Sequence, residues 1–224
     1  MDWWRDRFTG DEVRRLVVHA NEGLIVGAGI IEGLSLADHP ESIAILAGFA
    51  ALAAGALSAA GANYQENSTE REALEAFLQE EARLRDLSPE EELAELAAIY
   101  VDKGLTPDLA MEVARQLPAH EALAEHAVEE LGFSPDFMED RPILAAALTG
   151  IAFAIGALIP IVAVAVTPDA WSTPTLIVSV LAGLAVTSVV AARSSRMSVW
   201  KTVRRTLFFG IAALGVSALI GLIG

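Results

Sequence analysis

Hydrophobic residues are gathered along the chain into five long runs, separated by short polar connections and one long acidic segment. The clearest run, residues 43–62, contains 20 consecutive residues without a charge. About 20 apolar residues are enough for a helix to cross the hydrocarbon core of a bilayer. In chain order the runs predict five membrane-spanning helices, at about 13–37, 43–62, 142–166, 175–192 and 206–224.

The long polar segment, residues 65–141, also has helical patterns. Residues 66–85 are rich in Glu, Ala, Leu and Arg, and Ser88-Pro89 and Thr106-Pro107 are typical helix starts. A last helix is expected at about 120–131. The sequence therefore predicts an all-α membrane protein with five transmembrane helices and a helical cytoplasmic domain inserted between spans 2 and 3. Its predicted parts are an N-terminal interfacial segment with two spans (1–64), the acidic domain (65–141) and three further spans (142–224).

Charge is concentrated in that acidic domain. It holds 21 Asp or Glu against 6 Lys or Arg, while the rest of the chain has 9 of each, so the domain accounts for the whole net charge of −15. Such a local negative field attracts cations and repels nucleic acid. The absence of cysteine excludes disulfides, thiolate metal sites and cysteine catalysis. No nucleophile–base pair occurs in the spans, so we do not expect an enzyme.

Basic residues indicate the orientation in the membrane. They lie in the N-terminal segment, which also has Trp3 and Trp4, and between the fourth and fifth spans: Arg5, Arg7, Arg14 and Arg15, then Arg193, Arg196, Lys201, Arg204 and Arg205. Short loops rich in Lys and Arg face the cytoplasm. Five crossings then place the N-terminus and the acidic domain inside and the C-terminus outside. The N-terminus does not resemble a cleaved signal peptide, and the small size favours a prokaryotic plasma membrane.

Four polar residues of the first span are candidates for an ion path: His19, Asn21, Glu22 and Glu32. Charged residues inside a span are costly and usually face a polar path or a partner. His19 and Glu22 share a helix face, and Glu22 and Glu32 are separated by about 15 Å along the helix axis. They are candidates for two levels of one cation path. Alternatively, His19 and Glu22 are solvated at the cytoplasmic headgroups, and Glu32 lies near the outer water interface.

Small residues and one proline mark the spans as well. Gly23 and Gly27, and likewise Gly29 and Gly33, are four residues apart. This spacing allows close helix approach and suits either a dimer seam or a tight pore wall. Pro160 in the third span is expected to kink it or to release a backbone carbonyl.

In the acidic domain, carboxylates are paired at helical spacing. The pairs are Glu72 with Glu75 and Glu92 with Glu95, and Glu130 follows His126. Carboxylates on one helix face can offer oxygen ligands to divalent cations, and a histidine suits transition metals. The simpler interpretation is a solvated acidic helix face.

Four short segments, taken in order, resemble the vacuolar iron transporter family of ferrous-iron and manganese transporters. These segments are Asn21-Glu22-Gly23-Leu24, Gly55-Ala56-Leu57-Ser58 followed by Tyr64, Glu95-Leu96-Ala97-Ala98-Ile99-Tyr100 followed by Gly104-Leu105, and Gly156-Ala157-Leu158-Ile159-Pro160. Their order and spacing along the five spans carry the resemblance over nearly the whole chain.

The resemblance implies a homodimer whose first spans line a central path, with metal exchanged for protons. Glu22 stands where the family has its pore aspartate. Carboxylates of the cytoplasmic helices gather metal in the family, and the matching positions here are Glu92, Glu95 and Glu130, with Glu72 and Glu75 as further candidates. The metal, Fe²⁺ or Mn²⁺, would be a substrate and not a prosthetic group.

Besides Glu22, whose side chain is one methylene longer than the family's aspartate, three positions depart from the family pattern. Ala59 replaces an expected methionine, Asn63 an expected glutamate, and His126 another methionine. Glu66, one turn after Asn63, is a candidate to restore the lost carboxylate. Loss of the thioether removes the softest ligand, so the substrate is either a harder ion such as Mn²⁺, or transport is slow or absent.

Two main hypotheses follow. The leading one is a divalent metal transporter that moves Fe²⁺ or Mn²⁺ out of the cytoplasm by proton antiport. The alternative is a non-transporting membrane protein of the same fold that binds or senses metal or acts as a scaffold. Proton-coupled transport of an organic solute is a further possibility.

Overall fold

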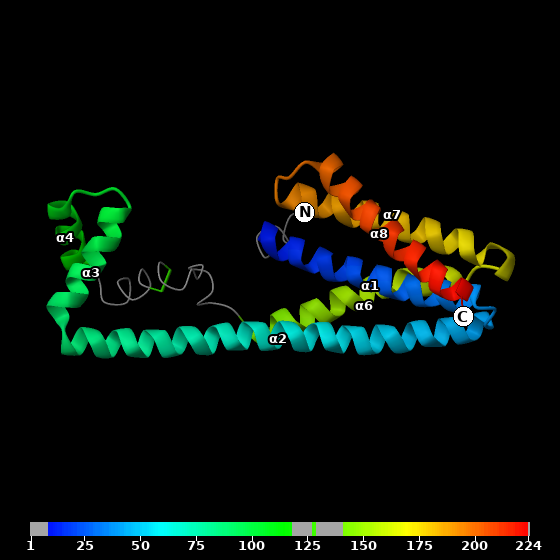
Figure 1. The fold of residues 1–224 in the computed structure, drawn as a ribbon, viewed down its shortest axis with the longest axis horizontal. Helices are drawn as coiled ribbons and strands as arrows, with labels where there is room; N and C mark the ends of the chain where they lie inside the picture. The colour runs from blue at the N-terminus through cyan, green and yellow to red at the C-terminus, as the bar shows by residue number, and fades with distance from the viewer. Residues whose placement is uncertain (1–8, 118–126, 129–140, 224) are drawn as a thin grey trace, which may run out of the picture. The chain divides into compact units, whose positions relative to one another are not determined.

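The computed structural model describes residues 9–117, 127–128 and 141–223, and every regular element within those ranges is helical (Figure 1). The chain divides into two compact units. The first, the membrane unit, comprises Met1–Tyr64 and Ile143–Gly224, and the second, the acidic unit, is Gln65–Pro142. The helices are α1 (Gly10–Leu36), α2 (Glu41–Leu87), α3 (Pro89–Asp102), α4 (Pro107–Gln116), α6 (Pro142–Ala165), α7 (Ser172–Ser194) and α8 (Val199–Ile223), with a short 3₁₀ helix η2 (Asp169–Trp171) before α7.

Five of these helices, α1, α2, α6, α7 and α8, are long and apolar enough to cross a membrane. They coincide with the five predicted spans, which confirms an all-α membrane protein. The fifth differs at its start, because α8 begins at Val199 and not near Thr206. Lys201, Arg204 and Arg205 therefore belong to the helix and not to a linker. Lys and Arg are good helix formers, and their long stems let the charged ends reach the membrane surface.

The second span and the first acidic helix form one continuous element. Helix α2 has 47 residues and contains both predicted segments, 43–62 and 66–85. No proline interrupts the sequence between them. At about 1.5 Å per residue the helix is roughly 70 Å long, more than twice the hydrocarbon thickness of a bilayer.

Helix α1 has well-defined ends. Thr9 and Glu12 form a capping box, in which the Glu12 N–H donates to the Thr9 hydroxyl (3.3 Å) and the Thr9 N–H donates to the Glu12 carboxylate (2.6 Å). At the other end the Ala37 N–H donates to the Gly33 carbonyl. Asp38 then adopts a positive φ of 58°, which turns the chain toward α2.

The core of the membrane unit is built around α1, which packs against α7 and α8. Its buried apolar residues come from all five long helices: Leu24, Ala28, Ile31, Ala44, Ile161, Val164, Leu176, Val180, Leu184 and Leu214. Pro160 is buried within α6, and the helix continues past it to Ala165. The predicted kink or released carbonyl at Pro160 stays a prediction.

In the acidic unit, α3 and α4 pack against each other around Leu96, Ala97, Ala110 and Ala114. Both helices begin at the predicted proline, and Gly104 between them has a positive φ of 101°. Neither Ser88 nor Thr106 caps its helix through a side-chain hydrogen bond. The last predicted helix, 120–131, lies outside the described residues except for positions 127 and 128.

Candidate functional site

Four consecutive residues at the middle of α1 face four different environments. The side-chain amide oxygen of Asn21 accepts a hydrogen bond of 2.6 Å from the Thr187 hydroxyl of α7, which also lies 2.9 Å from the Gly183 carbonyl oxygen. Gly23 packs on α6, and Leu24 is fully buried in the core. Successive helical residues are rotated by about 100°, so Glu22 points in a different direction from Asn21, Gly23 and Leu24, and it is exposed.

Glycine contacts fix this rotation of α1. A Cβ on Gly23 would overlap the Phe153 carbonyl oxygen, and a Cβ on Gly156 would overlap the Ala20 carbonyl oxygen. A Cβ on Gly27 would lie 3.0 Å from the Ala157 carbonyl oxygen. Helices α1 and α6 therefore cross with their backbones in contact, as small residues permit.

The second pair of glycines on α1, Gly29 and Gly33, packs on α8. The Ser217 hydroxyl donates to the Gly29 carbonyl, and a Cβ on Gly221 would overlap the Gly33 carbonyl oxygen. Both glycine pairs of α1, Gly23 with Gly27 and Gly29 with Gly33, therefore contact other helices of the same chain. Gly29 and Gly33 remain half-buried, so the interpretation of these glycines as a dimer seam or a tight pore wall stays a prediction.

Glu22 and His19 form a pair on the open side of α1. His19 Nδ1 lies 2.9 Å from Glu22 Oε2, and the two side chains are 25% and 52% exposed. Val18 and Val26, one turn to either side of Glu22, are exposed as well. A carboxylate next to an imidazole is a donor set suited to a divalent transition metal. Each chain therefore presents two candidate ligands on an uncovered helix face.

The Asn21–Thr187 hydrogen bond yields a stability prediction. Thr187→Val removes the hydroxyl and leaves the part-buried Asn21 amide without this donor. We expect the free energy of unfolding to fall by about 0.6–1.7 kcal/mol, from the average to the maximum measured for such hydrogen bonds in a membrane protein. Thr187→Ser, which keeps the hydroxyl, is the matched control. Denaturation in detergent would measure both, and a loss in Thr187→Val no larger than that in Thr187→Ser would contradict a contribution from this hydrogen bond.

Glu32 lies in a different environment from Glu22. Only 6% of the residue is exposed, and its Oε2 atom has no hydrogen-bond partner. It follows Leu24 and Ala28 at four-residue intervals, on the face of α1 that contributes to the core. An unpaired buried carboxylate is unfavourable as an anion, so this side chain is suited to carry a proton or to meet a cation. Whether Glu22 and Glu32 serve one path stays a prediction.

The two candidate path residues on α2 belong to different units. Asn63 is half-buried in the membrane unit, and Glu66 is exposed at the beginning of the acidic unit. Ala59, in place of the expected methionine, is half-buried and offers no ligand atom.

The carboxylates of the acidic unit lie mainly on its surface. Glu72, Glu75 and Glu95 are exposed and Glu92 is half-buried, and Glu75 pairs with Arg71 at 2.9 Å. Among the described residues no group of three or more His, Asp or Glu side chains is placed to hold a metal ion. His126 and Glu130 lie outside the described residues. The proposed ligand set of this unit therefore stays a prediction.

Another carboxylate of α2, Glu80, already forms an ion pair with an arginine, Arg83. Arg83 donates to both oxygens of Glu80, at 2.5 and 2.9 Å. This hydrogen bonding lowers the pKa of Glu80 from its ordinary value. Glu80 thus remains ionised to lower pH than an unpaired glutamate and is a weaker candidate for binding a second cation.

Comparison with known proteins shows extensive similarity. The model of the VIT family matches residues 13–222. A vacuolar iron transporter of Acanthamoeba castellanii is 35% identical over 163 residues, which is 73% of this chain and 59% of that protein. Vacuolar iron transporter 2 of Oryza sativa subsp. japonica is 29% identical over 72% of this chain and 66% of its own length. Vacuolar iron transporter 1 of Arabidopsis thaliana is 30% identical, over 72% of this chain and 65% of its own. The matched region thus spans 59–66% of these three relatives.

Proposed function

This chain belongs to the VIT family, and from that membership we propose that it is a divalent transition-metal transporter that exports Fe²⁺ or Mn²⁺ from the cytoplasm in exchange for protons. The names of its relatives, all vacuolar iron transporters, support iron as a substrate. They also agree with the expectation that the chain is not an enzyme. The observation that carries the proposal is the Glu22–His19 pair on an open face of α1.

The position of Glu22 along α1 favours an intramembrane site. Residue 22 is 12 residues from Gly10 and 14 from Leu36, or roughly 18 and 21 Å from the two helix ends. If α1 spans a hydrocarbon core of about 30 Å, Glu22 lies near its middle and not among the headgroups. A charged residue there costs about 2.5–3.5 kcal/mol on insertion scales, which is offset when it faces a polar path or a cation.

A second copy of the chain would complete the site. Fe²⁺ and Mn²⁺ commonly take six ligands, whereas the face around Glu22 offers one carboxylate and one imidazole. Two copies related by a two-fold axis would present two carboxylates and two imidazoles, and waters could fill the remaining positions. We therefore propose a homodimer in which the open faces of two α1 helices line the path, surrounded by membrane lipid.

Charge balance provides a reason for proton coupling. Two Glu22 carboxylates neutralise one divalent cation, and its departure would leave two uncompensated anions in a medium of low dielectric constant. Uptake of protons by these carboxylates restores neutrality. Buried Glu32 is a second candidate to carry a proton during this exchange.

The acidic unit has a supporting role in this proposal. Its negative charge would raise the local concentration of metal ions, with exposed Glu72, Glu75 and Glu95 as weak, solvated sites. Basic residues at the N-terminal end of α8 support an orientation with this unit in the cytoplasm. The proposed location is a prokaryotic plasma membrane, with the C-terminus outside.

A flux assay in reconstituted vesicles tests the proposal. Fe²⁺, Mn²⁺, Co²⁺ and Zn²⁺ would be offered in turn to vesicles with and without an acidic interior, and protein-free vesicles are the control. We expect Fe²⁺ or Mn²⁺ to enter faster when the interior is acidic, and the interior pH to rise as metal enters. A metal flux that ignores the pH gradient would remove the antiport part of the proposal.

A non-transporting metal-binding protein is the second candidate. It is favoured by Ala59 and Asn63, which lack the thioether and the carboxylate expected at these positions. Titration calorimetry that detects metal binding to the full chain, together with no flux of any of the four metals, would select this candidate over the transporter.

A further inference from the structure

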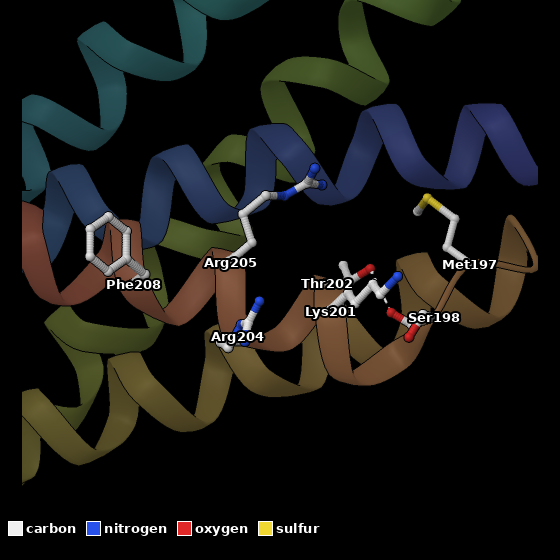
Figure 2. A pocket seen from close by; sticks show the side chains of 7 residues that line it. All are labelled: Met197, Ser198, Lys201, Thr202, Arg204, Arg205 and Phe208. Carbon is white, nitrogen blue, oxygen red and sulfur yellow. Dashed lines mark hydrogen bonds between the residues drawn. The ribbon is translucent and has the colours of Figure 1, made fainter.

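A basic cleft lies at the N-terminal end of α8, and neither His19 nor Glu22 is among the residues that line it. Its volume is about 610 Å³, and its polar lining includes Lys201, Arg204 and Arg205 with the hydroxyl residues Ser198 and Thr202 (Figure 2). Phe208, one turn further along α8, lines the same cleft. The Thr202 hydroxyl donates to the Ser198 carbonyl at 3.1 Å, so its proton is used within the helix.

The positive charge of this cleft is uncompensated by the surrounding sequence. Residues 170–224 contain no Asp or Glu. Within the described part of the chain, no carboxylate forms an ion pair with Lys201, Arg204 or Arg205. All three lie in the first two turns of α8, where the helix dipole adds a partial positive charge. Three cations at this end of a helix favour an anion from outside the chain.

The surface of α8 changes from cationic to aromatic within two turns. Phe208 and Phe209 are 66% and 63% exposed, with their rings 5.5 Å apart in an edge-on arrangement. Trp200, at the start of the helix, is 73% exposed. Exposed tryptophan is typical of the membrane–water interface, and exposed phenylalanine next to it of the acyl region. The cleft therefore has a cationic end at Lys201, Arg204 and Arg205 and an apolar end at Phe208.

We propose that this cleft binds the phosphate headgroup of an anionic phospholipid, with an acyl chain lying along Phe208. Arginine can bind phosphate through two parallel hydrogen bonds, and basic pockets beside membrane helices suit anionic headgroups. Inorganic phosphate would use only the cationic end and would leave Phe208 without a role. The site is separate from metal transport, so its test does not depend on flux.

Native mass spectrometry of the full chain in detergent tests this proposal. The probes are phosphatidylglycerol and phosphatidylcholine with identical acyl chains. We expect phosphatidylglycerol to bind at least about tenfold more tightly, and the double variant R204Q/R205Q to lose roughly tenfold or more of that affinity. The matched control is R14Q/R15Q, which removes two adjacent exposed arginines from the beginning of α1 and should change the affinity less than about threefold.

Further variants separate the sources of the anion and guard against misfolding. Phe208→Ala should weaken lipid binding, and millimolar inorganic phosphate should not displace the lipid. Lys201→Gln, a single exposed substitution, should lower the affinity several-fold if the double variant proves unstable. Equal binding of the two lipids, equal losses in both double variants, or full displacement by phosphate with no effect of Phe208→Ala would each overturn the proposal.

Discussion

Replacing Glu22 with glutamine is expected to reduce metal flux in reconstituted vesicles by roughly a hundredfold or more. The change keeps the shape of the side chain but removes the only charge on the open face at the middle of α1. Removing one partner of a charge interaction in a medium of low dielectric constant typically costs about 3–5 kcal/mol. The initial rate of Fe²⁺ or Mn²⁺ uptake, at equal amounts of reconstituted protein, measures this effect.

Two controls accompany this variant. Glu22→Asp introduces the aspartate that the resemblance to the family implies at this position, and it should retain a substantial fraction of the flux. Asp38→Asn also removes one carboxylate, but at the end of α1, and asparagine tolerates the positive φ of this position. Its flux should match the unmodified protein. A Glu22→Gln variant that transports normally would exclude Glu22 from the mechanism.

Adding a single methyl group at Gly23 is expected to destabilise the membrane unit severely. The Cβ of Gly23→Ala would overlap the Phe153 carbonyl oxygen, and backbone atoms cannot move aside as a flexible side chain can. We expect a loss of roughly 3 kcal/mol or more, the upper end of the range for overpacking. Gly156→Ala, which meets the Ala20 carbonyl oxygen across the same crossing, should behave alike. Thermal unfolding in detergent measures both.

The chain offers matched controls for this substitution. A Cβ on Gly61 or on Gly215 would meet nothing within 4 Å, and both residues lie in helices. Alanine is favoured over glycine in a helix by about 1 kcal/mol, so Gly61→Ala and Gly215→Ala should be neutral or slightly stabilising. Similar stability in the Gly23 and Gly61 variants would show that α1 and α6 do not cross in backbone contact.

The five spans could be predicted because each leaves a strong local signal, an apolar run about as long as a bilayer is thick. The predicted helix boundaries are wrong where this apolar signal is weak. Helix α8 begins at Val199, seven residues before the predicted start near Thr206, because basic residues lower the hydropathy without ending a helix. Helix α2 continues through Asn63 and Gln65 for the same reason, since polar residues alone do not stop a helix.

The candidate site could be predicted only in its local part. The His19–Glu22 contact follows from a separation of three residues on one helix. The partner of Asn21 is Thr187, 166 residues away, and nothing in the sequence near Thr187 singles it out. The burial of Glu32 could not be predicted either, because it depends on how α1 is rotated within the bundle.

Spacing alone also could not tell which helices use the glycines of α1. Gly23 and Gly27 would suit any close neighbour, and the tertiary fold assigns them to α6. In the acidic unit, carboxylates three residues apart do share a face, but nearby arginines compete for them. Arg71 pairs with Glu75 and Arg83 with Glu80, which local spacing of opposite charges could have indicated.

The backbone contact between α1 and α6 restricts how the protein can move. If α1 twisted about its own axis, the Ala20 carbonyl oxygen of α1 would collide with α6 at Gly156. The Phe153 carbonyl oxygen of α6 would likewise collide with α1 at Gly23. We therefore expect the two helices to move together as a pair. In a transporter that alternates between inward and outward states, this pair would tilt or slide as one body, with the hinge elsewhere in the bundle.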